Sequence, residues 1–304
     1  MSAVRHTGIT LARTWLRRAV LVVAAGLLLL LAGSLITGHG LNVRSFARSM
    51  LDLIQAVSHS QSVISPNPGD FRNVVFLHHS VGTNLIEQGH VREKFVEAGY
   101  VFWDHGYNWQ GLRDPAGQPT GYSYNVPSDN TDPDGLASIF AQPVYGIPLD
   151  TLSGLLQHDV IAFKSCFPAS QITHDEELAQ DKAWYAKIRD VMDQRRDKVF
   201  IAITPPPLNP AETTPEAAAR ARAFANWLTS DEFLNGHSNV FTFDLFGYLA
   251  EDDPASPDYN MLRKDYRDGA DSHPNQAANQ TVGPLLVDFI VKAADRYRPI
   301  SPSP

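Results

Sequence analysis

The chain has 304 residues, of which 43% are hydrophobic and 10% aromatic, which is enough to bury a large core. Charged residues make up only 19% of the chain, which excludes a disordered polyelectrolyte. The formal net charge of -8 argues against nucleic acid as a partner, because phosphate binding needs a surplus of Lys and Arg.

The first 36 residues are basic and then apolar. Four arginines, and no Asp or Glu, precede an apolar run over residues 19–36. A basic flank followed by about 18 apolar residues is typical of an export signal or an N-terminal anchor. We predict that residues 1–36 form a signal peptide or a membrane anchor, with cleavage and retention both open. The positive-inside rule then places the rest of the chain outside the cytoplasm, so the protein is a single-pass cell-membrane protein or is secreted. We expect any contact with the membrane to be through this helix only.

Composition divides the remainder into three parts. Residues 37–70 hold many Gly, Ser and Pro and are typical of a stalk or linker. Residues 71–298 carry the alternating patterns of a folded domain, and residues 299–304 are predicted to be a flexible tail. Cys166 is the only cysteine, so no disulfide within the chain stabilises the domain.

Short apolar runs alternate with helical patterns along the folded domain. Continuous apolar runs between helices indicate strands buried on both faces, and therefore a mainly five-stranded parallel sheet in a three-layer α/β/α sandwich. In such sheets ligands bind beyond the carboxyl ends of the strands. In chain order, the predicted elements are strand 73–77, helix 84–98, strand 100–103, strand 160–163, helix 175–195, strand 199–203, helix 214–228, strand 240–243 and helix 276–297.

Two segments carry residues that are typical of nucleophilic catalysis. Ser80 lies where the first strand passes into a helix, beside a helix N-terminus that favours a developing oxyanion. Asp271 and His273 lie just before the last helix, where an acid can fix the tautomer of a base, and Asp268 is the alternative acid. Each segment also has an ordinary interpretation, because serine is a common N-cap and Asp, Ser, Asn and Pro are common in turns.

Taken together, the two segments resemble the SGNH/GDSL hydrolase family. The residues around Ser80, Phe-Leu-His-His-Ser-Val, stand where that family has its Gly-Asp-Ser block after the first strand. Asp271, Ser272, His273 and Pro274 stand where the family has its C-terminal Asp and His. The resemblance spans nearly all of the folded domain. It implies a flavodoxin-like sandwich, a Ser80–His273–Asp271 triad, and hydrolysis of carboxylic esters, often acyl groups on sugars or lipids.

The middle of the domain departs from the family pattern. The family has an oxyanion glycine after the second strand, and Gly106 falls there. Its Gly-x-Asn-Asp block follows the third strand, where this chain has no Asn, so Ser165, Ser170, Asn108 or a backbone N–H would supply the missing donor. The family acid usually lies three residues before the His, and that position is Ala270 here.

Three residues near the strand ends are candidates for substrate binding: His79, Trp109 and Ser170. Trp109 belongs to a group of aromatic residues after the second strand. Aromatic faces suit sugar rings, although Trp and Tyr are equally common in cores and lids. We expect a small-molecule or glycan ester as the partner, and no cofactor.

Two further features have alternative interpretations. Asn130, Asp132 and Asp134 occupy alternate positions of a sequence like the first half of a calcium loop, but Ala141 stands where that loop needs a Glu. A turn is the favoured interpretation, and no metal is predicted. Cys166 follows the third strand, where it is either a nucleophile or a small buried hydrophobe.

The sequence therefore predicts an extracytoplasmic serine esterase that hydrolyses carboxylic esters, with carbohydrate as one candidate carrier of the acyl group. Two alternatives stay open. The same fold and nucleophile serve an acyltransferase that modifies a cell-envelope polysaccharide, and tethering to a membrane would favour that activity. A glycan-binding surface domain with weak catalysis is the other.

Overall fold

The computed structural model describes residues 54–60, 63, 69–107, 109–127 and 132–300, and those from Gln55 onward belong to one compact unit. The predicted signal or anchor, the C-terminal residues 301–304 and most of the predicted stalk lie outside the described residues. In the described part of the chain, no helix combines the length and the apolar character that crossing a bilayer requires.

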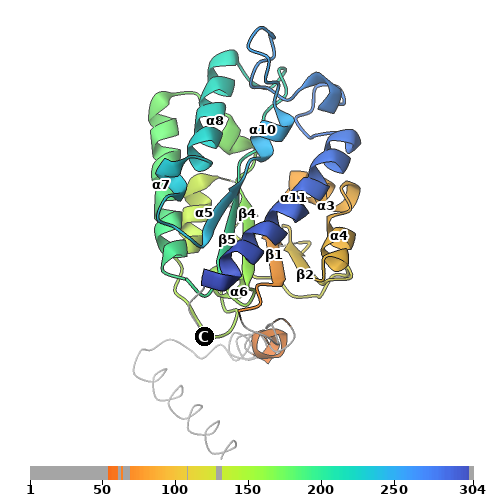
Figure 1. Cartoon of the computed structure of the whole chain (residues 1–304), viewed down its shortest axis with the longest axis vertical. Helices are drawn as coiled ribbons and strands as arrows, with labels where there is room; N and C mark the ends of the chain where they lie inside the picture. The colour runs from red at the N-terminus through yellow and green to blue at the C-terminus, as the bar shows by residue number, and fades with distance from the viewer. Residues whose placement is uncertain (1–53, 61–62, 64–68, 108, 128–131, 301–304) are drawn as a thin grey trace, which may run out of the picture. The chain divides into compact units, whose positions relative to one another are not determined.

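The sheet is mostly parallel and has six strands in the order β3-β2-β1-β4-β5-β6 (Figure 1). The predicted α/β fold with five parallel strands is confirmed. The sixth strand, β3, is antiparallel to β2 at the sheet edge; it has only two residues and no apolar run, so no sequence pattern marks it. The strands are β1 (Asn73–Leu77), β2 (Val101–His105), β3 (Leu112–Arg113), β4 (Val160–Lys164), β5 (Val199–Ile203) and β6 (Val240–Phe243).

Helices cover both faces of the sheet, because alternate side chains of the buried strands point to opposite layers. Val74 and Phe76 of β1 pack with one layer, and Val75 and Leu77 pack with the other. The first layer holds α3 (Ser80–Gln88), α4 (Val91–Glu97), α10 (Leu245–Leu249) and α11 (Gln276–Tyr297). The second holds α5 (Pro133–Phe140), α6 (Thr151–Leu155), α7 (Asp175–Asp193), α8 (Pro215–Leu228) and α9 (Asp231–Leu234). The 3-10 turns are η1 (Phe167–Ser170), η2 (Lys264–Tyr266) and η3 (Arg298–Ile300).

Two features of the first layer determine how α3 lies against α11. The predicted helix 84–98 is two helices, α3 and α4, because the chain turns at His90 with a left-handed φ of 54°. The C-terminal end of α3 then packs closely on α11, where Gly89 and Gly283 meet. A Cβ on Gly283 would collide with the backbone of Gly89. This close approach brings the helix that starts at Ser80 against the helix that follows His273.

Buried histidines lie on the side of the sheet that packs with the second layer. Tyr124 OH lies 2.9 Å from Nε2 of His158 and 3.3 Å from Nε2 of His59, and Nδ1 of His158 lies 3.1 Å from Asn73 Oδ1. His59 and Val63 belong to the stretch predicted as a stalk, and both are buried here. Burial lowers the pKa of His59 and of His105 to about 4, and it lowers the pKa of His158 well below its usual value.

These histidines predict a stability that falls with pH below about 6.5. Between about pH 6.5 and 4 the unfolded chain binds a proton at each of these imidazoles and the folded chain does not, so the free energy of unfolding decreases as pH falls. For His105, which is almost fully buried, the slope approaches about 1.4 kcal/mol per pH unit. Urea unfolding at pH 7, 6 and 5 measures this slope, and a flat profile would contradict the prediction.

One carboxyl group opposes this trend and supplies a control. Burial, followed by the charges of Glu177, Asp132 and Asp134, raises the pKa of Asp181 to about 7. Between about pH 7 and 4 the folded chain therefore holds a proton there that the unfolded chain releases, which stabilises the fold as pH falls. Asp181→Asn should make the loss of stability on acidification steeper than in the wild type.

Candidate active site

Ser80 is the first residue of α3 and follows directly on the fully buried strand β1. His79 takes the N-cap position in an extended conformation, and its carbonyl accepts the N–H of Thr83 at 2.9 Å. The turn leaves the Ser80 side chain half-buried at the carboxyl edge of the sheet. The N–H of Ser80 has no acceptor within the helix, because the first residues of a helix lack a carbonyl four residues earlier.

The loop that carries Asp271 and His273 is held in place by Asn209, which follows β5. The Asn209 side chain donates to the carbonyls of Gly269 and Asp271, both at 3.1 Å, and its backbone N–H donates to Ser272 Oγ at 2.9 Å. Ser272 is itself hydrogen-bonded to Glu212. These bonds fix the loop on the segment that follows β5. The orientation of His273 therefore depends on this contact between distant segments and not only on α11, the helix that follows it.

The structure brings Ser80, His273 and Asp271 into one chain of hydrogen bonds. Ser80 Oγ lies 2.7 Å from Nε2 of His273, and Nδ1 of His273 lies 2.8 Å from Asp271 Oδ1. A carboxylate only accepts, so Nδ1 carries the proton and Nε2 is left to accept the Ser80 hydroxyl. Phe167 places its ring at right angles to the imidazole with centroids 5.1 Å apart, which restricts rotation of His273. The arrangement can move a proton from the hydroxyl to the imidazole.

Asp271, rather than Asp268, is the acid that contacts His273. Its Oδ1 also accepts the backbone N–H of His273 at 3.2 Å, a bond that the two-residue spacing makes available. The hydrogen bond from His273 holds the pKa of the Asp271 carboxyl below its usual value, so the group stays ionised at neutral pH. The Asp271 side chain is 63% exposed, so water screens its charge.

Substitution of Asp271 and substitution of Asp268 should have different effects on activity. Asp271→Asn keeps the size of the side chain but offers an amide in place of the carboxylate that orients His273. We expect kcat for ester hydrolysis to fall about 100-fold, less than the roughly 10⁴-fold loss at buried triads, because Asp271 is largely exposed. Asp268→Asn is the matched control and should stay within about twofold of the wild type. The reverse ranking of the two variants would reassign the acid to Asp268.

The predicted oxyanion donors fare differently. The backbone N–H of His78 donates to the carbonyl of His105 at 3.0 Å, which places Gly106, the next residue, beside the turn that carries Ser80. The prediction for the Ser165 side chain is wrong. Ser165 alternates to the same layer as Phe163, where its Oγ lies fully buried 2.7 Å from Tyr185 OH. Asn108 lies outside the described residues.

Two of the three predicted substrate contacts are buried side chains in the structure. Ser170 is buried, and its hydroxyl donates to the carbonyl of Pro206 at 2.6 Å, so it holds a loop in place. His79 is buried with its ring 4.8 Å from that of Tyr107. Trp109 is the one of the three that is accessible to a substrate. It is 80% exposed and stacks nearly parallel to Tyr107, with centroids 6.2 Å apart.

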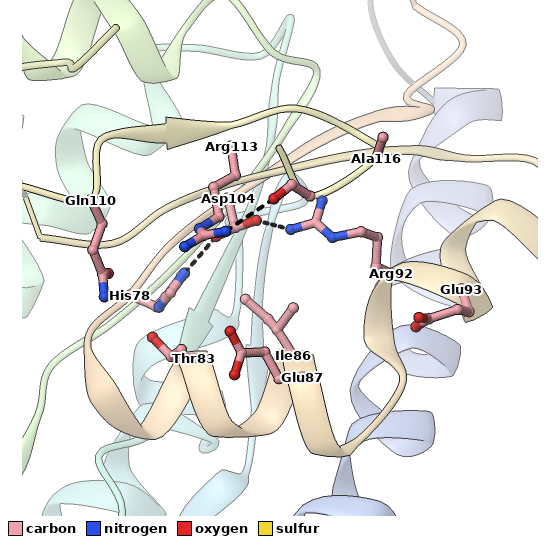
Figure 2. A pocket seen from close by; sticks show the side chains of 11 residues that line it. His78, Thr83, Ile86, Glu87, Arg92, Glu93, Asp104, Gln110, Arg113 and Ala116 are labelled. Carbon is pink, nitrogen blue, oxygen red and sulfur yellow. Dashed lines mark hydrogen bonds and ion pairs between the residues drawn. The ribbon is translucent and has the colours of Figure 1, made fainter. Parts of the chain in front are cut away.

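A cavity of about 300 Å³ lies along α3 and reaches His78 in the turn before Ser80, while Ser80, Asp271 and His273 are not among its lining residues (Figure 2). Thr83 and Glu87 line it and lie three and seven residues after Ser80, so they share its face of the helix. Most of the lining side chains are polar or charged. The complete lining is His78, Thr83, Ile86, Glu87, Arg92, Glu93, Asp104, Gln110, Arg113, Ala116 and Gly117.

Several residues of this site carry no recognisable signal in the sequence. Asn209 lies a few residues after the end of β5, but nothing in its neighbours reveals that it binds the His273 loop. Gln110 packs its side-chain amide against Gly106, close to His78. Arg92 reaches the site from α4, a helix that the sequence pattern did not separate from α3. Each depends on contacts between segments that are distant in the chain.

The other two sequence features show no catalytic arrangement. Asp132 is the N-cap residue of α5 and Asp134 accepts the N–H of Gly135, so this stretch begins a helix, with Asn130 outside the described residues. No group of three or more metal-binding side chains occurs among the residues that the structure describes. Cys166 is buried beside Lys164, whose pKa is lowered by burial, and neither contacts Ser80 in any hydrogen bond found here.

No family model and no curated protein matches the chain. Similar solved structures include a GDSL-like lipase from Bacteroides thetaiotaomicron, at 8% identity and a TM-score of 0.42 over 78% of this chain and 96% of that one. A candidate acylhydrolase from Bacteroides fragilis has 13% identity and a TM-score of 0.42 over 79% and 95% of the two chains. A protein from Streptococcus pneumonia described as a candidate platelet activating factor has 13% identity and a TM-score of 0.45 over 83% and 100%.

Two of these three structures are described as a GDSL-like lipase and a candidate acylhydrolase. At these TM-scores the similarity says nothing about activity, which has to be inferred from the geometry of the site.

Proposed function

We propose that this protein is a serine esterase that hydrolyses carboxylic esters through Ser80, His273 and Asp271. One observation carries the proposal: the Ser80 hydroxyl lies 2.7 Å from an imidazole that is 2.8 Å from a carboxylate on its far side. A serine hydroxyl is a weak nucleophile until a base within hydrogen-bond reach accepts its proton, and that base works best when an acid fixes its tautomer.

The reaction follows from these contacts. Ser80 Oγ attacks the acyl carbon while Nε2 of His273 takes the hydroxyl proton, and the imidazolium that forms is stabilised by Asp271. The N–H groups of Ser80 and Gly106 bind the oxyanion. The bond from the acyl carbon to the alcohol oxygen then breaks, and the alcohol leaves with the proton from His273. Water, activated by the same imidazole, attacks the acyl-enzyme and releases the carboxylic acid.

The polar cavity along α3, which reaches His78 two residues before Ser80, favours a polar alcohol and a short acyl group. The cavity along α3 offers guanidinium, carboxylate, amide and hydroxyl groups, with Ile86 and Ala116 as its few apolar side chains. Such a surface suits hydroxyl groups of a sugar and gives little burial to a long acyl chain. The exposed ring of Trp109 adds an apolar face of the kind on which sugar rings stack.

The substrate class is tested with the full-length protein in detergent. Turnover of p-nitrophenyl acetate should exceed that of p-nitrophenyl octanoate, and a peracetylated monosaccharide should release acetate. Trp109→Ala should raise KM for the sugar ester severalfold and leave KM for the small p-nitrophenyl acetate nearly unchanged. A preference for octanoate would overturn the proposal of a short acyl group on a sugar.

We further propose that the enzyme acts outside the cytoplasm, held by or released from the segment 1–36, on small-molecule or glycan esters. The four arginines before the apolar run support this orientation. Protease accessibility of the domain in intact cells tests it, and protection of the domain from added protease would contradict it.

A further inference from the structure

The peptide unit between His79 and Ser80 has an unusual second contact. Its carbonyl accepts the helical N–H of Thr83 at 2.9 Å and also faces Nδ1 of His78 at 3.0 Å. A carbonyl only accepts, so Nδ1 of His78 donates to it. Because a trans peptide is planar with its N–H opposite its carbonyl, fixing this carbonyl also fixes the direction of the Ser80 N–H.

The other ring nitrogen of His78 contacts the carboxylate of Asp104, which is itself paired with the guanidinium of Arg92. Nε2 of His78 lies 3.1 Å from Asp104 Oδ2, and the other carboxylate oxygen is paired with Arg92, as Figure 2 shows. Burial alone raises the pKa of Asp104, but the hydrogen bonds and charges of His78 and Arg92 outweigh it and hold that pKa below its usual value. An ionised carboxylate only accepts, so both nitrogens of His78 face acceptors.

Gly82 explains why this arrangement fits inside a helix. A Cβ on Gly82 would collide with the Cβ and Cγ atoms of His78, which is itself 1% exposed. The first turn of α3 therefore has no side chain where the imidazole lies. The His-His-Ser-Val-Gly stretch thus combines a donor at His78, the hydroxyl of Ser80 and the space left by Gly82.

We propose that His78, held by Asp104 and Arg92, is a positioning residue that orients and polarises the His79–Ser80 peptide as an oxyanion donor. The site then contains two Asp–His pairs with different tasks. Asp271 and His273 handle the proton of the hydroxyl, and Asp104 and His78 act on the peptide whose N–H meets the developing oxyanion. A hydrogen bond donated to the carbonyl polarises the peptide and makes its N–H a stronger donor, in a buried site where water screens little. This inference rests on the serine esterase function proposed above.

Two substitutions of His78 separate positioning from packing. In His78→Asn the side-chain amide can reproduce the Nδ1 donor, whereas His78→Leu fills the space with an apolar group and has no donor. Removal of one oxyanion donor costs roughly 100-fold to 1,000-fold in kcat, so we expect misorientation of one in His78→Leu to cost about 10-fold to 100-fold. His78→Asn should retain more activity than His78→Leu, although leucine preserves the packing better.

The measurements are kcat and KM for p-nitrophenyl acetate, and the affinity for a boronic acid that mimics the tetrahedral intermediate. We expect kcat and boronic acid affinity to fall in parallel while KM changes little, because only the transition state carries the oxyanion. Gly82→Ala, which displaces the His78 ring, should have the same effect and serves if a His78 variant does not fold.

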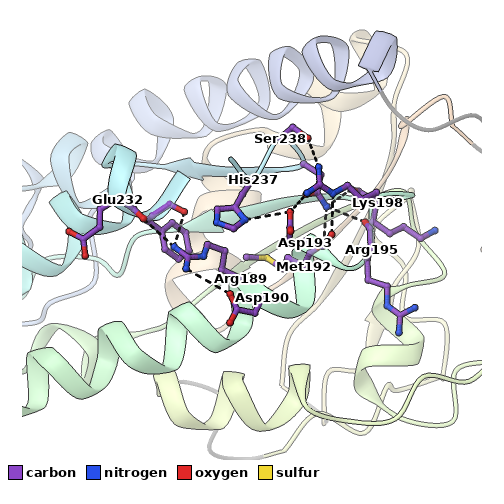
Figure 3. A network of polar contacts seen from close by, with 12 residues as sticks. Arg189, Asp190, Met192, Asp193, Arg195, Lys198, Glu232, His237 and Ser238 are labelled. Atoms are coloured by element: carbon purple, nitrogen blue, oxygen red, sulfur yellow. Dashed lines mark hydrogen bonds and ion pairs between the residues drawn. The ribbon is translucent and has the colours of Figure 1, made fainter. Parts of the chain in front are cut away.

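His237 supplies the control, because it forms a similar pair with Asp193, at 3.4 Å, near the amino end of β6 (Figure 3). His237→Leu should leave kcat and boronic acid affinity unchanged. A His78→Leu variant with unchanged kcat, or with lower kcat but unchanged boronic acid affinity, overturns the inference. Full activity in Ser80→Ala would instead overturn the proposed function, so the two failures are distinguishable.

Discussion

Ser80→Ala should reduce kcat for p-nitrophenyl acetate by roughly 10⁴-fold to 10⁶-fold, which leaves a rate near the detection limit. The physical reason is that the acyl-enzyme route ends when the hydroxyl is removed. The side chain is half-buried and its hydroxyl is hydrogen-bonded to His273, so the loss of one oxygen should leave the fold intact. Binding of the ester should persist, because alanine leaves the cavity along α3 unchanged.

The measurement compares initial rates at matched concentrations of folded protein, with circular dichroism as the check on folding. Ser238→Ala is the matched control. Ser238 loses a hydroxyl in the same way, but its partner is Arg196, far along the chain from α3 and α11. A Ser80→Ala protein that retains wild-type turnover would remove Ser80 from the mechanism.

His273→Gln should have the second-largest effect, with a loss of roughly 10⁴-fold to 10⁶-fold in kcat. Glutamine retains a hydrogen-bonding side chain of similar length, but its amide cannot accept a proton from Ser80 near neutral pH. Because Ser80 and His273 act as one unit, the double variant Ser80→Ala/His273→Gln should be hardly slower than either single variant.

This non-additivity is the decisive feature of the comparison. Losses that multiply in the double variant would show that the two side chains act independently, which contradicts a shared proton transfer. His237→Gln provides the histidine control and should keep full activity, since His237 pairs with Asp193 and not with any residue of the site.

The fold could be predicted largely from local patterns. Apolar runs such as Val199–Ile203 are continuous because both faces of the strand are buried, and that property is visible in the sequence. β3 and the break at His90 were not predictable in this way. β3 depends on pairing with β2, and at the break the left-handed residue is His90 and not the neighbouring Gly89.

The pairing of Ser80 with His273 could also be anticipated, because each lies next to the carboxyl end of a predicted strand or at the start of a predicted helix. The donors around them could not. Ser165 looks suitable from its place in the chain, but strand alternation turns it toward Tyr185. The role of His78 is hidden in the sequence, because its partner Asp104 lies 26 residues further along the chain and is itself paired with Arg92 from another helix.

The measurement that tests the central claim most directly is covalent labelling of the full-length protein with a fluorophosphonate, followed by peptide mass spectrometry. The reagent reacts with a serine only when a neighbouring base has activated it. We predict a single adduct on the peptide that contains Ser80, and its disappearance in His273→Gln. An esterase whose adduct lies on another serine, or whose Ser80 stays unlabelled while hydrolysis continues, would contradict the account.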